Sequence, residues 1–102
     1  MLYVVTLTYI RPMDDIKAHL DTHREWLAEH LKAGTIIAAG PMEPAVGGIV
    51  LAHCASRDEL DAMLKTDSFH RQNLVEYDIR CFKPALGAEA FAEALTLKPS
   101  LI

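Results

Sequence analysis

Three of the five histidines in the chain fall within the segment HLDTHREWLAEHL, residues 19–31, at positions 19, 23 and 30. Residues three or four positions apart lie on one side of an α-helix, so a helix here places the three imidazoles and Trp26 in one stripe. An imidazole near neutral pH can bind a metal ion or accept a proton as a general base. The stripe is therefore a metal site, a catalytic site or the polar border of a helix that packs on a core.

A metal site would use His19 and His23, which are one helical turn apart, as a ligand pair. A structural or catalytic zinc ion needs three or four protein ligands, and the Glu that follows the first His in H-E-x-x-H is replaced by Leu20. We therefore expect no metal site, and we interpret His19 and His30 as residues at the rim of the core. We expect no cofactor either, because Gly47-Gly48 lacks the third glycine and the strand-to-helix context of a dinucleotide-binding fingerprint.

His23 is the candidate general base because a carboxylate elsewhere in the chain can be paired with it. Asp67 lies in LKTDSFHRQNL, a turn between a predicted helix and the last predicted strand. An Asp close to an imidazole fixes its tautomer and raises its basicity, as a general base requires. The spacing alone favours another role for Asp67, as a cap of the turn from Ser68 to Arg71. Both roles stay open at this point.

The elements that must position these residues follow from the pattern of apolar residues. Residues 2–9 form a strand in which Thr6 and Thr8 alternate with apolar residues. A helix follows, capped by Asp14 or Asp15, and ends near Ala33, where Gly34 supplies the left-handed residue. Its apolar arc, which should face the sheet, consists of Ile16, Leu20, Leu27 and Leu31.

The second half of the chain repeats the order of strand and helix. Residues 35–40 and 47–54 form two short strands, and Ser56 with Glu59 matches a capping box at the start of a helix that runs to about Lys65. Residues 75–84 form a half-buried strand, with Tyr77, Ile79 and Cys81 on the dry side. We expect a domain at residues 1–84 and a C-terminal extension at residues 85–102, in which residues 87–97 form a helix with Phe91 and Leu95 on one stripe.

The predicted order β-α-β-β-α-β is that of a ferredoxin-like α+β fold, a four-stranded antiparallel sheet with two helices on one face. The other face of the sheet is left uncovered in a chain of 102 residues, which is the length of one domain. Packing this face against a second copy is the usual solution, so we expect a homodimer.

Composition narrows the range of partners. The net charge is −4 and the ten basic residues are scattered, so we expect no nucleic-acid partner. No apolar run approaches the roughly 20 residues that span a bilayer, and the start lacks the pattern of a signal peptide. We therefore expect a soluble, cytoplasmic protein that makes no membrane contact. Cys54 and Cys81 lie in apolar strand-like runs, where we expect free, buried thiols.

The chain resembles the YciI-like, or YCII-related, family of the dimeric α+β barrel superfamily. The resemblance covers about residues 1–84 and rests on LYVVTLTY, HREWLAEHLKAGTIIAAGP, GGIVLAHCASRDELDAML, TDSF and EYDIRCFKP, in that order. It implies a ferredoxin-like dimer with a pocket in each subunit, lined by a His that maps onto His23 and an Asp that maps onto Asp67. The family often has Pro after the Asp, where this chain has Ser68, and Phe69 is kept. Ser in place of Pro at position 68 affects the expected rigidity of the turn more than the expected role of the Asp67 carboxylate.

Members of the family include a dehydrochlorinase of a chlorinated hydroxyquinol, and similar barrels host muconolactone isomerases and small monooxygenases. The resemblance therefore implies a small-molecule enzyme in which His23 and Asp67 carry out acid–base chemistry of the lyase, isomerase or dehydrochlorinase type on a compact aromatic or lactone-like substrate. The alternatives are a small-ligand-binding or regulatory module without turnover, and a scaffold for dimerisation. The candidate substrate-binding residues are Arg11, Trp26, Pro41 and Phe69, although Arg11 also fits a solvated turn and Trp26 fits packing.

Overall fold

The computed structural model describes residues 1–94 and contains one antiparallel sheet with helices on one face. The strands are β1 (Leu2–Tyr9), β2 (Ile36–Pro41), β3 (Gly47–His53) and β4 (Val75–Phe82). Their spatial order is β2-β3-β1-β4, and every neighbouring pair is antiparallel. The predicted α+β fold with the order β-α-β-β-α-β is confirmed.

The two central strands are fixed in register by their side-chain alternation. Tyr3, Val5 and Leu7 of β1 point toward the helices and belong to the core, and Val5 lies opposite Val50 of β3. Gly47 opens β3 where the strands approach most closely, and a Cβ atom at this position would overlap the carbonyl of Leu7. Residue 47 therefore has to be glycine for β3 to pair with β1 in this register.

The first predicted helix is two helices, α1 (Met13–Ala18) and α2 (Leu20–Ala33), separated by His19. Asp14 and Asp15 lie in the first turn of α1, where their negative charges interact favourably with the positive end of the helix dipole. Neither side chain caps the helix, so the prediction of an Asp cap was wrong. The side of α2 that carries Trp26 packs on the core, whereas Leu31 is 43% exposed, so the predicted burial of Leu31 was wrong. Gly34 ends α2 with a φ of 82°, as predicted.

The second helical region consists of α3 (Arg57–Lys65) and the single-turn α4 (Ser68–Arg71). Ser56 caps α3, since its side chain accepts a hydrogen bond from the N–H of Glu59. The Glu59 carboxylate accepts from the N–H of Ala55, one residue before the position expected for a capping box. Asp67 occupies the corresponding capping position of α4.

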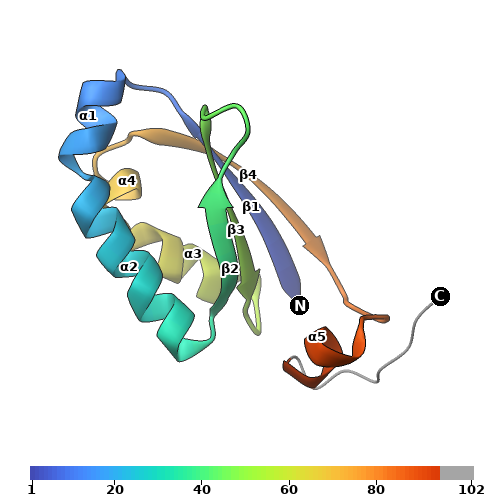
Figure 1. Cartoon of the computed structure of the whole chain (residues 1–102). Coiled ribbons are helices and arrows are strands. Elements are labelled where there is room, and N and C mark those ends of the chain that lie inside the picture. The colour runs from blue at the N-terminus through green and yellow to red at the C-terminus, as the bar shows by residue number, and fades with distance from the viewer. Residues whose placement is uncertain (95–102) are drawn as a thin grey trace.

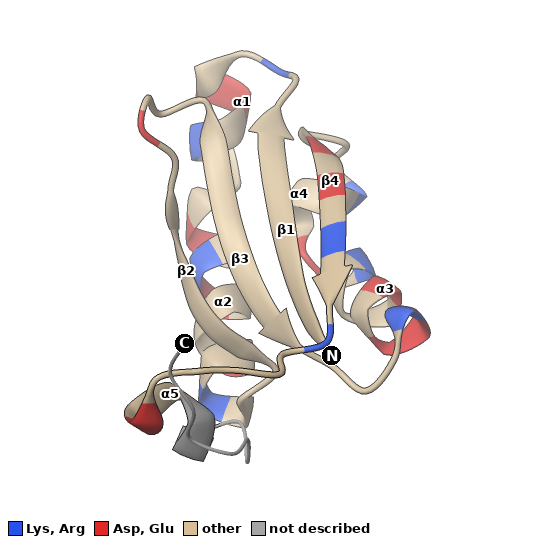
Figure 2. Cartoon of the chain, turned by 90° about the vertical axis from the view of Figure 1, so that its right-hand side faces the viewer, with Lys and Arg blue, Asp and Glu red and all other residues tan. Residues whose placement is uncertain are grey.

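Helices α1 to α4 cover one face of the sheet, and the opposite face is not covered by a helix within the described residues (Figures 1 and 2). The core between the layers contains Ile16 and Trp26 from the first helices and Leu60, Met63 and Leu64 from α3. All Lys, Arg, Asp and Glu residues of the four strands lie on β4, which is an edge strand (Figure 2). The uncovered face is therefore uncharged across β1, β2 and β3.

After β4 the chain leads to α5 (Glu89–Ala94), beyond one end of the sheet (Figure 1). The predicted helix at 87–97 is thus present in part, and its remainder with Leu95 lies outside the described residues. Cys54 is buried, as expected, whereas Cys81 is exposed. The expectation for Cys81 was wrong because β4 extends beyond the helical layer, so its dry side ends before residue 81.

Candidate functional site

The site is built around a pair of side chains from α2 and from the start of α4. His23 Nδ1 lies 2.8 Å and 2.9 Å from the two carboxylate oxygens of Asp67. An ionised carboxylate can only accept hydrogen bonds, so Nδ1 is the protonated nitrogen, and in the neutral imidazole Nε2 is then the one with a lone pair. Asp67 is fully buried and the His23 side chain is 12% exposed. The arrangement is that of an imidazole held in one tautomer by a carboxylate shielded from water.

Asp67 combines the two roles that the sequence left open. Its Oδ1 accepts a hydrogen bond from the backbone N–H of Phe69 at 3.2 Å, which caps α4. The same carboxylate accepts from His23, so the cap and the pair share one charged group. Because Asp67 is held by the backbone of its own turn, its position does not depend on His23 alone.

Ser68 ties the turn to α2 through its hydroxyl group. Its hydroxyl donates to the carbonyl of His19 at 3.2 Å and lies 2.8 Å from Oγ1 of Thr22. The same carbonyl accepts a hydrogen bond from the N–H of His23 at 3.1 Å, because His19 is the N-cap residue of α2. These contacts supply, through side chains, the rigidity that a Pro would give through its ring.

Aromatic rings fix the plane of the imidazole. The rings of His23 and Phe69 are parallel within 1°, with centroids 3.9 Å apart. Trp26 lies on the same stripe, 5.9 Å from His23 by ring centroids, and its Nε1 donates to the Met63 carbonyl and to Thr66. The imidazole can therefore rotate little without losing both the carboxylate and the stack.

His23 and Phe69 line a cavity of about 380 Å³ between α2 and the strands. This volume falls in the lower part of the range for small-molecule sites. Its strand wall includes Pro41 and Tyr9, and its helix wall includes Arg24. Two of the four expected substrate-binding residues, Pro41 and Phe69, thus lie around the same cavity as His23.

The other two expected residues lie elsewhere. The Arg11 guanidinium donates to the carbonyl of its neighbour Ile10 and does not line the cavity. Trp26 is 5% exposed and packs in the core. His30, the last member of the stripe, bonds to Thr35 at 3.0 Å through Nδ1 and has no carboxylate partner among the described residues.

The cavity also contains a residue that the sequence reasoning did not select. Arg24 lines it from α2, and it lies between Leu20 and Leu27 at helical spacing. A charged residue within an apolar helical stripe was the available signal. The sequence alone does not show that this stripe borders a cavity, because the strands that form the opposite wall are distant in the chain.

No group of three His, Cys, Asp or Glu side chains placed to hold a metal ion occurs within residues 1–94. His19 contributes its backbone carbonyl to the contacts with Thr22 and Ser68. An imidazole oriented by a carboxylate can accept and return a proton.

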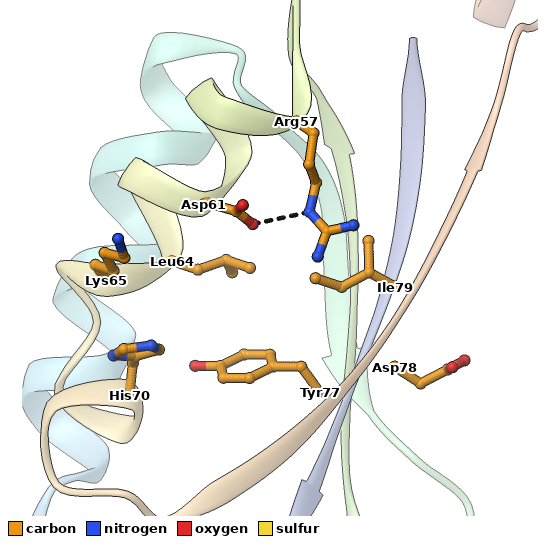
Figure 3. A pocket seen from close by; sticks show the side chains of 8 residues that line it. All are labelled: Arg57, Asp61, Leu64, Lys65, His70, Tyr77, Asp78 and Ile79. Atoms are coloured by element: carbon orange, nitrogen blue, oxygen red, sulfur yellow. Dashed lines mark hydrogen bonds and ion pairs between the residues drawn. The ribbon is translucent and has the colours of Figure 1, made fainter.

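A second cavity of about 380 Å³ lies between α3 and β4, on the other side of α4 (Figure 3). Arg57 and Asp61 form an exposed ion pair at 2.8 Å on its rim, and His70 and Tyr77 face each other across it. The Tyr77 hydroxyl is buried and has no hydrogen-bond partner within the described residues. Burial, and then the nearby charge of Asp67, raise the pKa of Tyr77. No part of the His23–Asp67 pair lines this cavity.

The fold and the paired side chains define an α+β protein with one imidazole–carboxylate pair beside a small cavity. The family model described as YCII-related domain matches residues 1–83, and the chain belongs to this family, as its sequence indicated. Curated proteins gave no match.

A solved structure with a similar fold is that of 5-chloro-2-hydroxyhydroquinone dehydrochlorinase (TftG) from Burkholderia phenoliruptrix AC1100, in complex with 2,5-dihydroxybenzoquinone. The likeness covers 81% of this chain and 94% of that chain, with 24% identity and a TM-score of 0.59. At this identity the likeness establishes the shared fold. Separately, none of the helices in the described part of the chain is long and apolar enough to cross a membrane.

Proposed function

We propose that the cavity beside His23 is the active site of a small-molecule enzyme. His23 is the general base: Nε2 accepts a proton from an acidic C–H or O–H group of a compact aromatic or lactone-like substrate. The protonated imidazole then returns the proton to a leaving group or to another carbon atom, so the reaction is an elimination or an isomerisation. Asp67 holds the imidazole and stabilises its positive charge. A positioned base of this kind accelerates a reaction by about 10² to 10⁴.

The observation that carries this proposal is the contact of 2.8 Å between His23 and the buried Asp67, with His23 at the cavity wall. A histidine at the rim of a core needs no buried carboxylate. Two further observations fit a substrate site: the stack of His23 on Phe69, and the mainly apolar lining of the cavity. The relative TftG was solved with a small quinone, which suggests a ring-shaped ligand for this cavity as well.

The tautomer can be tested before any substrate is known. Correlation of the imidazole ¹⁵N and carbon-bound ¹H nuclei should show His23 protonated at Nδ1 and unprotonated at Nε2 at neutral pH. The Asp67→Asn variant should lose this fixed tautomer. His30 is the matched control, because it lies on the same helix and bonds to a hydroxyl. A neutral His23 protonated at Nε2 would contradict the proposed base.

The reaction is tested with hydroxylated quinones and lactones, first for binding by thermal shift and then for turnover. His23→Ala and Asp67→Asn should each lower kcat about 10²-fold or more, whereas His30→Ala should leave it within a few-fold. A ligand that stabilises the wild type and is never consumed would favour a binding or regulatory module instead.

We also propose that two copies pack through the uncovered sheet face. By alternation, Val4 and Leu51 point to this face, and Ile49 is 43% exposed. The charges of Glu76, Asp78 and Arg80 lie at one edge of it. Light scattering at micromolar concentration should give twice the chain mass, and Leu51→Glu should shift it toward the single chain. A wild type that scatters as a single chain would refute the dimer.

A further inference from the structure

The lining of the His23 cavity contains basic side chains and no acidic ones. Its residues include one permanently charged side chain, Arg24, together with the imidazole of His23 and the hydroxyl of Tyr9. All other lining residues are apolar or glycine, and none is acidic. Asp67 does not line the cavity, and its carboxylate is engaged by His23 and by the N–H of Phe69. The permanent charge on the cavity lining is therefore the positive charge of Arg24.

The charge of Arg24 is not neutralised within the described chain. The ion pairs of residues 1–94 are His23–Asp67, Arg57–Asp61 and Arg80–Asp78, and Arg24 takes part in none of them. Asp21, one turn earlier on α2, makes no ion pair with it. The Arg24 side chain is exposed and lies at the cavity beside Leu20 and Leu27, so it is free to bind an anionic group of a ligand. Its planar fork also matches the two oxygens of a carboxylate.

His23 and Arg24 are consecutive, yet both reach the same cavity. Neighbouring residues of a helix point about 100° apart and do not face each other. A ligand in this cavity is therefore held at two separated points of α2, with the imidazole at one and the guanidinium at the other.

We propose that Arg24 selects the substrate of this site, and that the substrate is a small ring compound bearing a carboxylate or another delocalised oxyanion. This inference rests on the proposed function and names its substrate class. Arg24 binds the anionic group, and the group that loses its proton lies at His23. Arg24 is a binding residue in this scheme and takes no part in the proton transfer.

Benzoate and benzamide form a matched pair of probes, because they are similar in shape and differ in charge. Their Kd values are measured by ¹H–¹⁵N NMR titration of the full chain, following the amides of α2 and of Phe69. The wild type should bind benzoate at least 10-fold more tightly than benzamide. Arg24→Gln should reduce this ratio to about 1, and Arg24→Lys should keep part of it, because the charge remains without the fork.

Arg11→Gln is the control, since it removes the same charge from a residue that does not line the cavity. It should leave the benzoate-to-benzamide ratio unchanged. A wild type that does not prefer benzoate, or an Arg11→Gln variant that loses the preference as fully as Arg24→Gln, would overturn the proposal. The measurement involves no turnover, so charge selectivity in a protein that never consumes a ligand would refute catalysis and leave the role of Arg24 standing.

Discussion

The imidazole of His23 and the phenyl ring of Phe69 lie face to face, with parallel planes and centroids 3.9 Å apart. Phe69 is two residues beyond Asp67, so one short turn provides both the hydrogen-bond acceptor at the edge of the imidazole and the apolar surface against its face. The ring is thereby oriented in two perpendicular directions. A protonated imidazole is also favoured over an aromatic face, which suits a base that becomes positively charged.

Replacement of Phe69 by Leu should retain an apolar residue and remove the stack. We expect the free energy of unfolding to fall by about 1–2 kcal/mol, because a buried aromatic pair and part of the packing are lost. The carbon-bound protons of His23 should move downfield as the ring current of Phe69 disappears. Urea unfolding and NMR measure the two effects. Unchanged His23 shifts would mean that the rings do not stack in solution.

Replacement of Asp67 tests the cost of leaving its partners unsatisfied. Asp67→Ala removes the acceptor for His23 Nδ1 and for the N–H of Phe69, so we expect a loss of about 2–4 kcal/mol. Asp67→Asn keeps one acceptor oxygen and should lose less. The two variants are compared by urea unfolding at pH 7. Equal losses would mean that the carbonyl oxygen of Asn replaces neither contact.

Ser68→Ala should release the start of α4 from α2. The hydroxyl is buried and contacts the His19 carbonyl and Thr22, so its removal should cost about 1 kcal/mol. Ser68→Pro should lose the same contacts but is tolerated at the first position of a helix. Hydrogen exchange of the α4 amides should accelerate in Ser68→Ala. Unchanged exchange would contradict a tie between the two helices.

Tyr77→Phe should raise the free energy of unfolding by about 1 kcal/mol at pH 7, because it removes a buried hydroxyl that has no partner within the described residues. The pKa of Tyr77 is raised by burial and by the charge of Asp67, so the folded state keeps the proton above the pH, about 10, at which the unfolded chain releases it. The stability that the folded protein gains from keeping this proton on Tyr77 is fully present below about pH 10 and is lost as the pH rises further.

Urea unfolding between pH 8 and pH 11 should therefore show a steeper alkaline decline for the wild type than for Tyr77→Phe. The comparison between the two proteins cancels the titration of the other tyrosines and of the cysteines. Parallel declines would show that Tyr77 ionises in the folded protein as readily as in the unfolded chain.

The two cysteines should differ in reactivity. Cys81 is exposed, whereas Cys54 is buried, and burial followed by the nearby Glu59 carboxylate raises the pKa of the Cys54 thiol. The thiolate is the reactive form, so iodoacetamide at pH 7.5 should alkylate Cys81 quickly and Cys54 slowly. Mass spectrometry of the native protein should show one fast modification, absent in Cys81→Ser. Equal rates at both positions would contradict the burial of Cys54.

The architecture could be predicted from the sequence because β1 and β4 carry a clear alternation, β2 and β3 are short apolar runs, and Gly34 and Ser56 mark helix boundaries. The break at His19 could not, since no Gly or Pro occurs there and the hydroxyls of Thr22 and Ser68 that bond to its carbonyl act through tertiary contact. The expected burial of Leu31 was also wrong, because the side of α2 that carries Trp26 packs on the core.

The pairing of His23 with Asp67 could be predicted from the sequence only in part. Helical spacing selected His23, and the local turn pattern identified Asp67 as a cap, which it is. Their contact spans 44 residues of sequence, so no local pattern contains it, and the pairing came from the order of elements and the family resemblance. The wall of the cavity joins α2 to three strands, which explains why Arg24 and Tyr9 were not selected as a group.

The brevity of α4 has a consequence for partial unfolding. Its four residues and their cap supply Asp67 and Phe69, whereas the sheet has its own extensive ladder of backbone hydrogen bonds. Small units with few backbone bonds open at a lower free energy than a whole domain. A local opening of this one turn would separate His23 from its carboxylate while the strands stay paired. Under mild denaturant the protein should therefore lose ligand binding before it loses its circular dichroism.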